Sequence, residues 1–329
     1  MSGSGAAPTA LVLHPACALH DTGWGHPEHQ GRLPAIVNAI ERDTPALLHV
    51  VLQREAEPAS VADLLRVHTR AHVERVEAAA ERAAREGEPV LLDADTVVSA
   101  ASWEAALGAA GCAITGAELV LRGEAHTAFA LSRPPGHHAS ADRAMGFCLF
   151  NNVAIAARRV QAEWGIERVL IVDWDVHHGN GTQEIFYEDP TVYYLSFHLA
   201  DHYPGTGAAA ERGAGPGLGT TRNVPLPHGL PAGDYRGAFA AALAAALEEF
   251  EPGFVFVSAG FDCLAGDPLG GLSLEPADLH ALTRLLIERT RASARGRVVA
   301  VLEGGYAPAR LGAGAVSVLR ALAGLPPGE

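Results

Sequence analysis

The stretch Arg168-Val-Leu-Ile-Val-Asp-Trp-Asp-Val-His-His-Gly-Asn180 passes within a few residues from an apolar run to acidic, imidazole and amide side chains. A short run rich in valine and isoleucine predicts a buried strand over residues 168–173. The polar residues follow at the point where this strand would end. Since ligands of open α/β sheets bind outside the carboxyl ends of the strands, this stretch predicts both a parallel sheet and a functional site at its edge.

The rest of the chain alternates in the same way between apolar runs of strand length and longer segments of helical period. This alternation predicts an α/β fold with a mostly parallel sheet and helices on both faces. The predicted strands are 10–15, 127–132, 168–173, 192–197, 254–259 and 297–302. The predicted helices are 69–86, 102–121, 151–164, 234–250, 276–294 and 309–323. No linker or repeat divides the chain, so we predict a single domain over residues 1–329.

The composition excludes several classes of function. The chain has 38 acidic and 24 basic residues, a formal charge of −14 and no lysine. The acidic balance argues against nucleic-acid binding. A pyridoxal Schiff base, a Walker-A loop and a lysine nucleophile each need the amine that this chain lacks.

The hydropathy and the N-terminal residues predict a soluble, cytoplasmic protein. The longest near-apolar run, residues 237–247, is about half of the ~20 residues that span a membrane, and residues 1–13 lack the basic flank of a secretory signal. The four cysteines are widely spaced and form no C-x-x-C pair. We therefore expect a cytoplasmic protein that binds neither membrane nor nucleic acid. The sequence leaves open whether it forms a homo-oligomer.

Polar residues follow the expected carboxyl ends of five strands. These segments are Arg133-Pro-Pro-Gly-His-His138, Asp173-Trp-Asp-Val-His-His178, Ser196-Phe-His198, Phe261-Asp262 with Asp267, and Glu303-Gly-Gly-Tyr306. Because these strand ends share one edge of a parallel sheet, we expect the five segments to converge.

A carboxylate and an imidazole are separated by one residue in Asp175-Val-His177, so both can reach one ion. A third ligand must come from another strand end, and Asp267 is the predicted one. Such a set leaves coordination positions open, which is typical of catalytic zinc.

The adjacent imidazoles of His137 and His138 suit proton transfer near neutral pH. Asp173 and Asn180 are the polar residues predicted to orient His137 and His138 respectively. Tyr306 follows two glycines and can donate a hydrogen bond to a developing oxyanion. The aromatic side chains of Phe147 and Tyr203 can line a slot for an aliphatic chain.

These motifs, in this order from about His14 to Tyr306, resemble the histone deacetylase family on the arginase/deacetylase fold. Asn180 and the segment His20-Asp-Thr-Gly-Trp-Gly-His-Pro-Glu28 resemble class II-like and bacterial members. One stretch departs from the family, because residues 199–204 lack the usual Arg-Tyr-Asp of class II.

The resemblance implies a zinc-dependent deacetylase that acts on a peptide or small-molecule N-acyl amide. It implies zinc ligands at Asp175, His177 and Asp267. It implies a general base and acid at His138 with His137 as its electrostatic partner, and Asp173 and Asn180 as the residues that orient these histidines. It also implies an oxyanion donor at Tyr306. It also implies a substrate tunnel at Gly146, Phe147 and Tyr203. It further implies structural potassium, with an inner site at Asp173, Asp175, His177, Ser196 and Phe197 and an outer site at Phe186, Asp189 and Val192.

Leu269 bears on the substrate. In the polyamine-specific branch that the chain resembles, a glutamate at the matching position reads an internal ammonium group, which leucine cannot do. We therefore expect acyl-lysine or a similar uncharged chain to be preferred over acetylpolyamines.

Three alternatives stay open. A ureohydrolase on the same fold would bind two manganese ions and needs a further D-x-D-type motif, whereas four residues separate Asp262 from Asp267 here. A dinucleotide site is suggested by Gly205-Thr-Gly-Ala-Ala-Ala210, although no helix is predicted to follow it. A sensor of acylated amines without catalysis is the non-enzymatic alternative.

Overall fold

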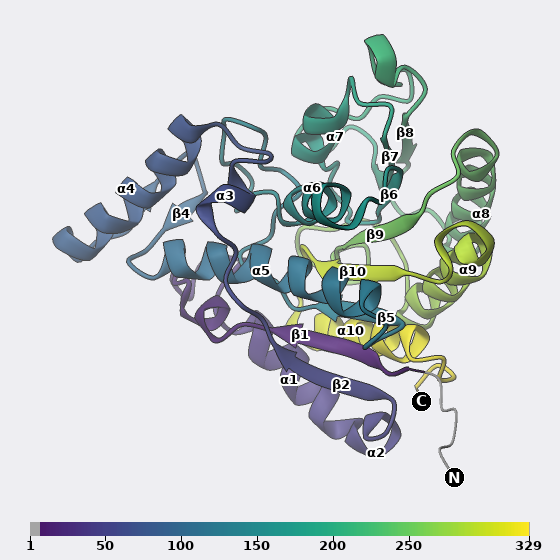
Figure 1. Ribbon diagram of the computed structural model, residues 1–329. Helices are drawn as coiled ribbons and strands as arrows, with labels where there is room; N and C mark the ends of the chain where they lie inside the picture. Colours follow the sequence, from purple (N-terminus) through teal and green to yellow (C-terminus); the bar gives the residue numbers. More distant parts are fainter. Residues whose placement is uncertain (1–6, 329) are drawn as a thin grey trace.

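The centre of the protein is an eight-stranded sheet in the order β2-β1-β5-β10-β9-β6-β7-β8, and every pair of neighbouring strands is parallel. The computed structural model describes residues 7–328 (Figure 1). The strands of this sheet are β1 Thr9–Leu13, β2 Val51–Glu55, β5 Thr127–Ala130, β6 Val169–Asp173, β7 Val192–Leu199, β8 Thr221–Leu226, β9 Phe254–Ala259 and β10 Val298–Leu302. A separate antiparallel pair is formed by β3 Val90–Leu91 and β4 Val97–Val98.

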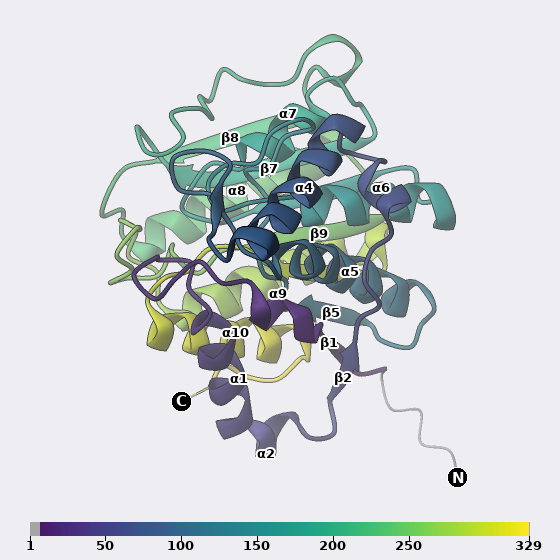
Figure 2. The same ribbon diagram turned by 90° about the vertical axis from the view of Figure 1, so that its left-hand side faces the viewer.

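Helices cover both faces of the sheet (Figures 1 and 2). One face carries α5 Ser102–Leu121 and α6 Asn152–Trp164, which pack on each other and on β1, β5, β10 and β9. The opposite face carries α1 Arg32–Arg42, α8 Ala232–Glu249, α9 Pro276–Ala294 and α10 Pro308–Leu322. The remaining helices are α2 Thr44–Leu47, α3 Val61–Leu64, α4 Arg70–Glu86, α7 Asn180–Phe186 and the 3₁₀ turns Pro15–Leu19 and Gly215–Gly217.

Helix α5 shows why the core is so apolar. It is long and apolar enough to cross a membrane by length and composition, a property that a search for uninterrupted apolar runs misses. Most of this helix is buried, and it packs against the sheet through small residues. A Cβ atom at Gly116 would lie 3.3 Å from the side chains of Ala128 and Val299, so glycine permits the close approach. Burial in the core therefore accounts for its composition.

Each predicted strand and helix is present, with its ends within two residues of the prediction. The elements missing from the prediction lie mainly at the margins of the fold. Strand β2 is an edge strand with three exposed residues, and β8 is an edge strand that contains Pro225. Edge strands have one unpaired side and tolerate polar residues and proline, so their sequences lack the apolar run used for prediction.

The five strands that precede the polar segments are β5, β10, β9, β6 and β7, and they are consecutive neighbours in the sheet. Their carboxyl ends consequently form one continuous edge. The predicted parallel α/β architecture is confirmed, and the fold brings the five segments together.

Candidate active site

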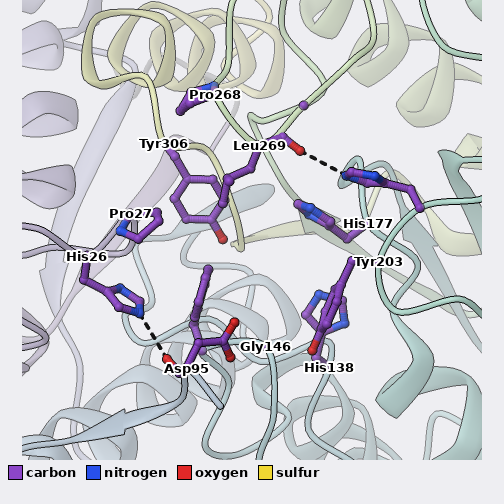
Figure 3. Close-up of a pocket in the computed structure, with 13 residues that line it drawn as sticks. His26, Pro27, Asp95, His138, Gly146, His177, Tyr203, Pro268, Leu269 and Tyr306 are labelled. Atoms are coloured by element: carbon purple, nitrogen blue, oxygen red, sulfur yellow. Dashed lines mark hydrogen bonds between the residues drawn. The ribbon is translucent and has the colours of Figure 1, made fainter. Parts of the chain in front are cut away.

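A pocket of about 430 Å³ opens at this edge of the sheet (Figure 3). Its walls are formed by His26, Pro27, Asp95, His138, Gly146, Phe147, His177, His202, Tyr203, Pro268, Leu269, Gly270 and Tyr306. Residues from the β5, β6, β7, β9 and β10 loops thus face one cavity. The hydroxyl end of the Tyr306 side chain points toward its interior.

Three buried side chains near the floor of this pocket have the geometry of a metal site. The ligand atoms of Asp175, His177 and Asp262 all lie within 4.8 Å of one another. His177 Nδ1 is 3.1 Å from Asp175 Oδ1 and 3.3 Å from Asp262 Oδ2. Asp262 Oδ2 is buried and accepts no hydrogen bond. A buried carboxylate oxygen without a donor is costly unless a cation compensates it.

Two glycines leave space for these carboxylates, because a side chain at either position would collide with them. A Cβ atom at Gly260 would lie 2.1 Å from Asp175 Oδ2, and one at Gly304 would lie 2.1 Å from Asp262 Oδ2. Burial, and then the charge of Asp175, raise the pKa of Asp262 to about 7. This crowding of buried acids around one imidazole fits a divalent cation.

The predicted third ligand, Asp267, follows the same strand as Asp262 but is not one of the three clustered residues, so its role as a metal ligand stays a prediction. Asp267 Oδ2 accepts hydrogen bonds from the backbone N–H groups of Tyr306 (2.6 Å) and Ala307 (3.0 Å). Its Oδ1 accepts one from Leu269 N–H at 3.0 Å. The Asp267 carboxylate therefore fixes the loop that carries Tyr306.

The two histidines of the β5 loop have the predicted partners. His137 Nδ1 donates to Asp173 Oδ2 at 3.0 Å, and His138 Nδ1 donates to Asn180 Oδ1 at 2.8 Å. Their ring centroids are 4.0 Å apart. Asp173 ends β6, and Asn180 is the first residue of α7, so both partners come from the segment after one strand.

The surroundings of His137 and His138 give the two imidazoles different protonation states. Burial disfavours the charged form of His137, but the carboxylates of Asp175 and Asp173 outweigh it and raise its pKa to about 10. Burial and the neighbouring imidazoles of His137 and His177 lower the pKa of His138 well below its usual value. At neutral pH this leaves His138 unprotonated beside a charged His137, as a general base requires.

Tyr306 lies across the pocket from His138. Its ring meets the ring of Phe147 edge-on with centroids 5.8 Å apart, and the Arg32 guanidinium lies 5.1 Å from its centroid. Burial raises the pKa of the Tyr306 hydroxyl well above its usual value. The hydroxyl is therefore protonated at neutral pH and available as a donor.

Gly146 and Phe147 both adopt a left-handed backbone conformation, with φ of 55° and 69°. A Cβ atom at Gly146 would lie 2.5 Å from His138 Cδ2, so the close approach of the backbone requires glycine. Tyr203 packs edge-on against His138 with ring centroids 5.1 Å apart. The predicted tunnel residues thus line the pocket, Tyr203 included, despite the departure at residues 199–204.

Several lining residues were not anticipated. The His202 ring stacks on that of His177 at 5.1 Å and 19°, and its Nε2 donates to the Leu269 carbonyl at 3.2 Å. His26 and Asp95 come from two loops that no predicted strand precedes directly. A search confined to strand ends could not find them, because their proximity depends on the path of long loops.

The residues proposed for potassium fall into two groups. Asp173, Asp175 and His177 lie at the end of β6, beside Ser196 and Phe197 of β7. At the second group, Asp189 accepts hydrogen bonds from Thr191 and pairs with Arg158, and its N–H donates to the Phe186 carbonyl at 3.0 Å. Val192 begins β7 nearby. Both potassium sites stay predictions.

Comparison with known proteins places the chain in a family. Residues 26–322 match the histone deacetylase domain. The chain is 40% identical over 314 residues to histone deacetylase 10, chloroplastic, of Oryza sativa subsp. japonica, covering 92% of this chain and 70% of the relative. It is 38% identical over 328 residues to the histone deacetylase-like amidohydrolase of Pseudomonas aeruginosa, covering 97% and 83%. A crystal structure of the HDA15 HD domain matches with a TM-score of 0.90 and 37% identity, covering 98% of this chain and 89% of that one. The chain belongs to the histone deacetylase family.

Proposed function

We propose that this protein is a zinc-dependent deacetylase that hydrolyses a linear N-acyl amide. One observation carries the proposal: His177 of the metal cluster, the unprotonated His138 and the hydroxyl of Tyr306 face the same pocket. Asp175 and His177 would bind the ion together with a carboxylate that follows β9, either the predicted Asp267 or Asp262 of the buried cluster. When bound, zinc would polarise the amide carbonyl and lower the pKa of water towards ~7.

The side chains around the pocket can perform the remaining steps. His138 accepts the proton of the attacking water and later passes it to the departing amine, while Asn180 keeps its ring in place. The charged His137 stabilises negative charge nearby, and Asp173 orients it. The Tyr306 hydroxyl donates a hydrogen bond to the oxyanion as the carbonyl carbon becomes tetrahedral.

The lining supports an acyl-lysine-like substrate. Phe147, Tyr203 and Leu269 form an apolar part of the pocket wall. Leu269 carries no charge that would bind an internal ammonium group. We propose a peptide or small-molecule acyl amide as substrate, with potassium as a structural ion. We further propose a cytoplasmic location without nucleic-acid or membrane partners. Acetylpolyamine hydrolysis is the alternative within the same chemistry.

The two rival functions have less support. One cluster of metal-ligating residues is found in the described part of the chain, whereas a dimanganese ureohydrolase needs two ions. Residues 205–214, which contain the dinucleotide-like glycines, form a loop without a following α-helix N-terminus to bind a pyrophosphate.

The decisive experiment assays acylated lysine peptides, acetylpolyamines and other small acetylamines with protein of measured metal content. We expect hydrolysis with one zinc per chain and none in His138→Ala. A zinc-loaded wild-type protein that is inert on the whole panel but binds acylated amines would identify a sensor. Two manganese ions per chain with urea release would identify a ureohydrolase.

A further inference from the structure

Glu303 is a buried carboxylate that the proposed chemistry does not use. It follows the last residue of β10 and is completely buried. Its Oε2 atom accepts hydrogen bonds from the backbone N–H groups of Gly136 (2.7 Å) and His137 (3.1 Å), and its Oε1 accepts one from the Ser258 hydroxyl at 3.1 Å. Two of its three donors thus belong to the turn that precedes His138.

The same turn is also fixed from its other side. Asn152, at the start of α6, donates from Nδ2 to the Pro134 carbonyl at 3.0 Å. A Cβ atom at Gly136 would lie 2.5 Å from the Asn152 backbone nitrogen, so the turn lies directly against the helix. The turn before His138 therefore lies between two side chains, that of Glu303 after β10 and that of Asn152 at the start of α6.

Glu303 is also linked to the loop that carries Tyr306. Arg32 donates from Nη2 to the Glu303 carbonyl at 2.5 Å and from Nε to the Gly305 carbonyl at 2.7 Å. Arg32 in turn pairs with the buried carboxylate of Glu28 at 2.8 Å. The backbone of Glu303 is thereby fixed to the Tyr306 side of the pocket, while its carboxylate reaches the histidine side.

We infer that Glu303 is a positioning residue that sets the His137–His138 turn relative to Tyr306. The consequence for catalysis rests on the proposed function, whereas the positioning of the turn does not. A general base must lie within hydrogen-bond reach of the proton that it abstracts. An error of about 1 Å in such a group can cost about 10²-fold in rate.

The chemistry of the contacts selects the informative substitutions. In Glu303→Gln, the amide oxygen can accept from both backbone N–H groups, and the amide nitrogen can donate to the Ser258 oxygen once that hydroxyl rotates. In Glu303→Asp, the charge is kept but the side chain is shorter by one methylene and cannot reach the turn. The length of the side chain at position 303 should therefore affect the position of the turn more than its charge does.

The test measures kcat and KM separately for both variants. We expect Glu303→Asp to lower kcat about 10²-fold with KM nearly unchanged, and Glu303→Gln to retain kcat within about threefold. Asp63→Ala is the matched control, because Asp63 is a buried residue on α3 whose carboxylate accepts hydrogen bonds from Ser60 and which does not line the pocket. It should lower the melting temperature without changing kcat per folded molecule.

Hydrogen exchange of the backbone amides over residues 136–139 gives a readout that needs no turnover. Exchange should be faster in Glu303→Asp than in wild type and unchanged in Asp63→Ala. Unchanged exchange in Glu303→Asp, or a rate loss equal to that of the control, would overturn the inference. If wild type hydrolyses no amide, the proposed function fails, and the exchange data alone decide whether Glu303 positions the turn.

A second route applies if Glu303→Asp does not fold. Combining Glu303→Gln with Ser258→Ala removes the group that orients the glutamine amide. A loss of exchange protection at residues 136–139 greater than the sum of the losses in the single variants supports the inference, and a purely additive loss contradicts it.

Discussion

Asp262 Oδ2 lies 3.3 Å from His177 Nδ1 and accepts no hydrogen bond, although it is fully buried. Its other oxygen accepts a hydrogen bond from Val176 N–H at 2.9 Å, so the carboxylate is oriented with its free oxygen toward the imidazole. By contrast, both oxygens of Asp267 accept hydrogen bonds from backbone N–H groups. The two carboxylates that follow β9 thus differ in their hydrogen bonding, and each is a candidate for the third ligand beside Asp175 and His177.

The first prediction follows from that difference. Asp175→Ala should remove both the bound zinc and the turnover, because it deletes a ligand. Of Asp262→Ala and Asp267→Ala, the variant that deletes the third ligand should also lose the zinc, whereas the other should keep most of the metal. Metal analysis of the purified variants, together with kcat, checks this. Full zinc in Asp262→Ala with a metal-free Asp267→Ala would confirm Asp267 as the third ligand, the reverse result would identify Asp262, and full zinc in Asp175→Ala would contradict the site.

The Tyr306 hydroxyl should act in the transition state more than in the bound substrate. Tyr306→Phe deletes one oxyanion donor and should lower kcat by roughly 10²–10³ with little change in KM. Steady-state kinetics at saturating metal measures both constants. A change confined to KM would assign the hydroxyl to substrate binding.

Leu269 should favour a substrate without an internal charge. We expect wild type to show a higher kcat/KM for acetyl-lysine peptides than for N8-acetylspermidine, and Leu269→Glu to shift the ratio toward the polyamine, since the new carboxylate faces the pocket. Leu218→Glu, on an exposed residue outside the pocket, controls for added negative charge. A wild-type preference for the polyamine that the glutamate leaves unaltered would show that the cation is recognised elsewhere.

Two buried histidines should make the fold sensitive to acid. Burial lowers the pKa of His68 and of His178 to about 3, below the usual 6.5. At these two residues the unfolded chain therefore binds more protons below pH 6.5, so their contribution to stability is fully present above that pH and is lost as the pH is lowered toward 3. At pH 5 each histidine should cost about 2 kcal/mol relative to pH 7.5.

Urea unfolding at pH 7.5 and pH 5 measures this loss. His68→Gln, which keeps a polar side chain among its hydrogen-bonding partners, should reduce the difference between the two pH values by about 2 kcal/mol. An unaltered difference would mean that His68 is already protonated in the folded protein or that other groups dominate the acid response.

Periodicity and strand-end chemistry were enough to predict most of the fold and the location of the site. The apolar runs of β5, β6, β7, β9 and β10 lie in the centre of a parallel sheet, where both faces are buried, so their sequences carry an unmistakable signal. Because parallel strands share one carboxyl edge, polar residues after these strands had to converge. The pairing of His137 with Asp173 and of His138 with Asn180 follows from the same rule.

Other features depended on tertiary structure because they arise from contacts between distant segments. The different hydrogen bonding of Asp262 and Asp267 depends on which backbone N–H groups are near each carboxylate, and those of Tyr306 and Ala307 come from the segment after a different strand. His202 faces the metal cluster only because its loop folds back over His177. Local sequence determines which chemical groups stand near the end of a strand, whereas the direction in which a loop side chain points is decided by the hydrogen bonds and packing that the rest of the fold supplies.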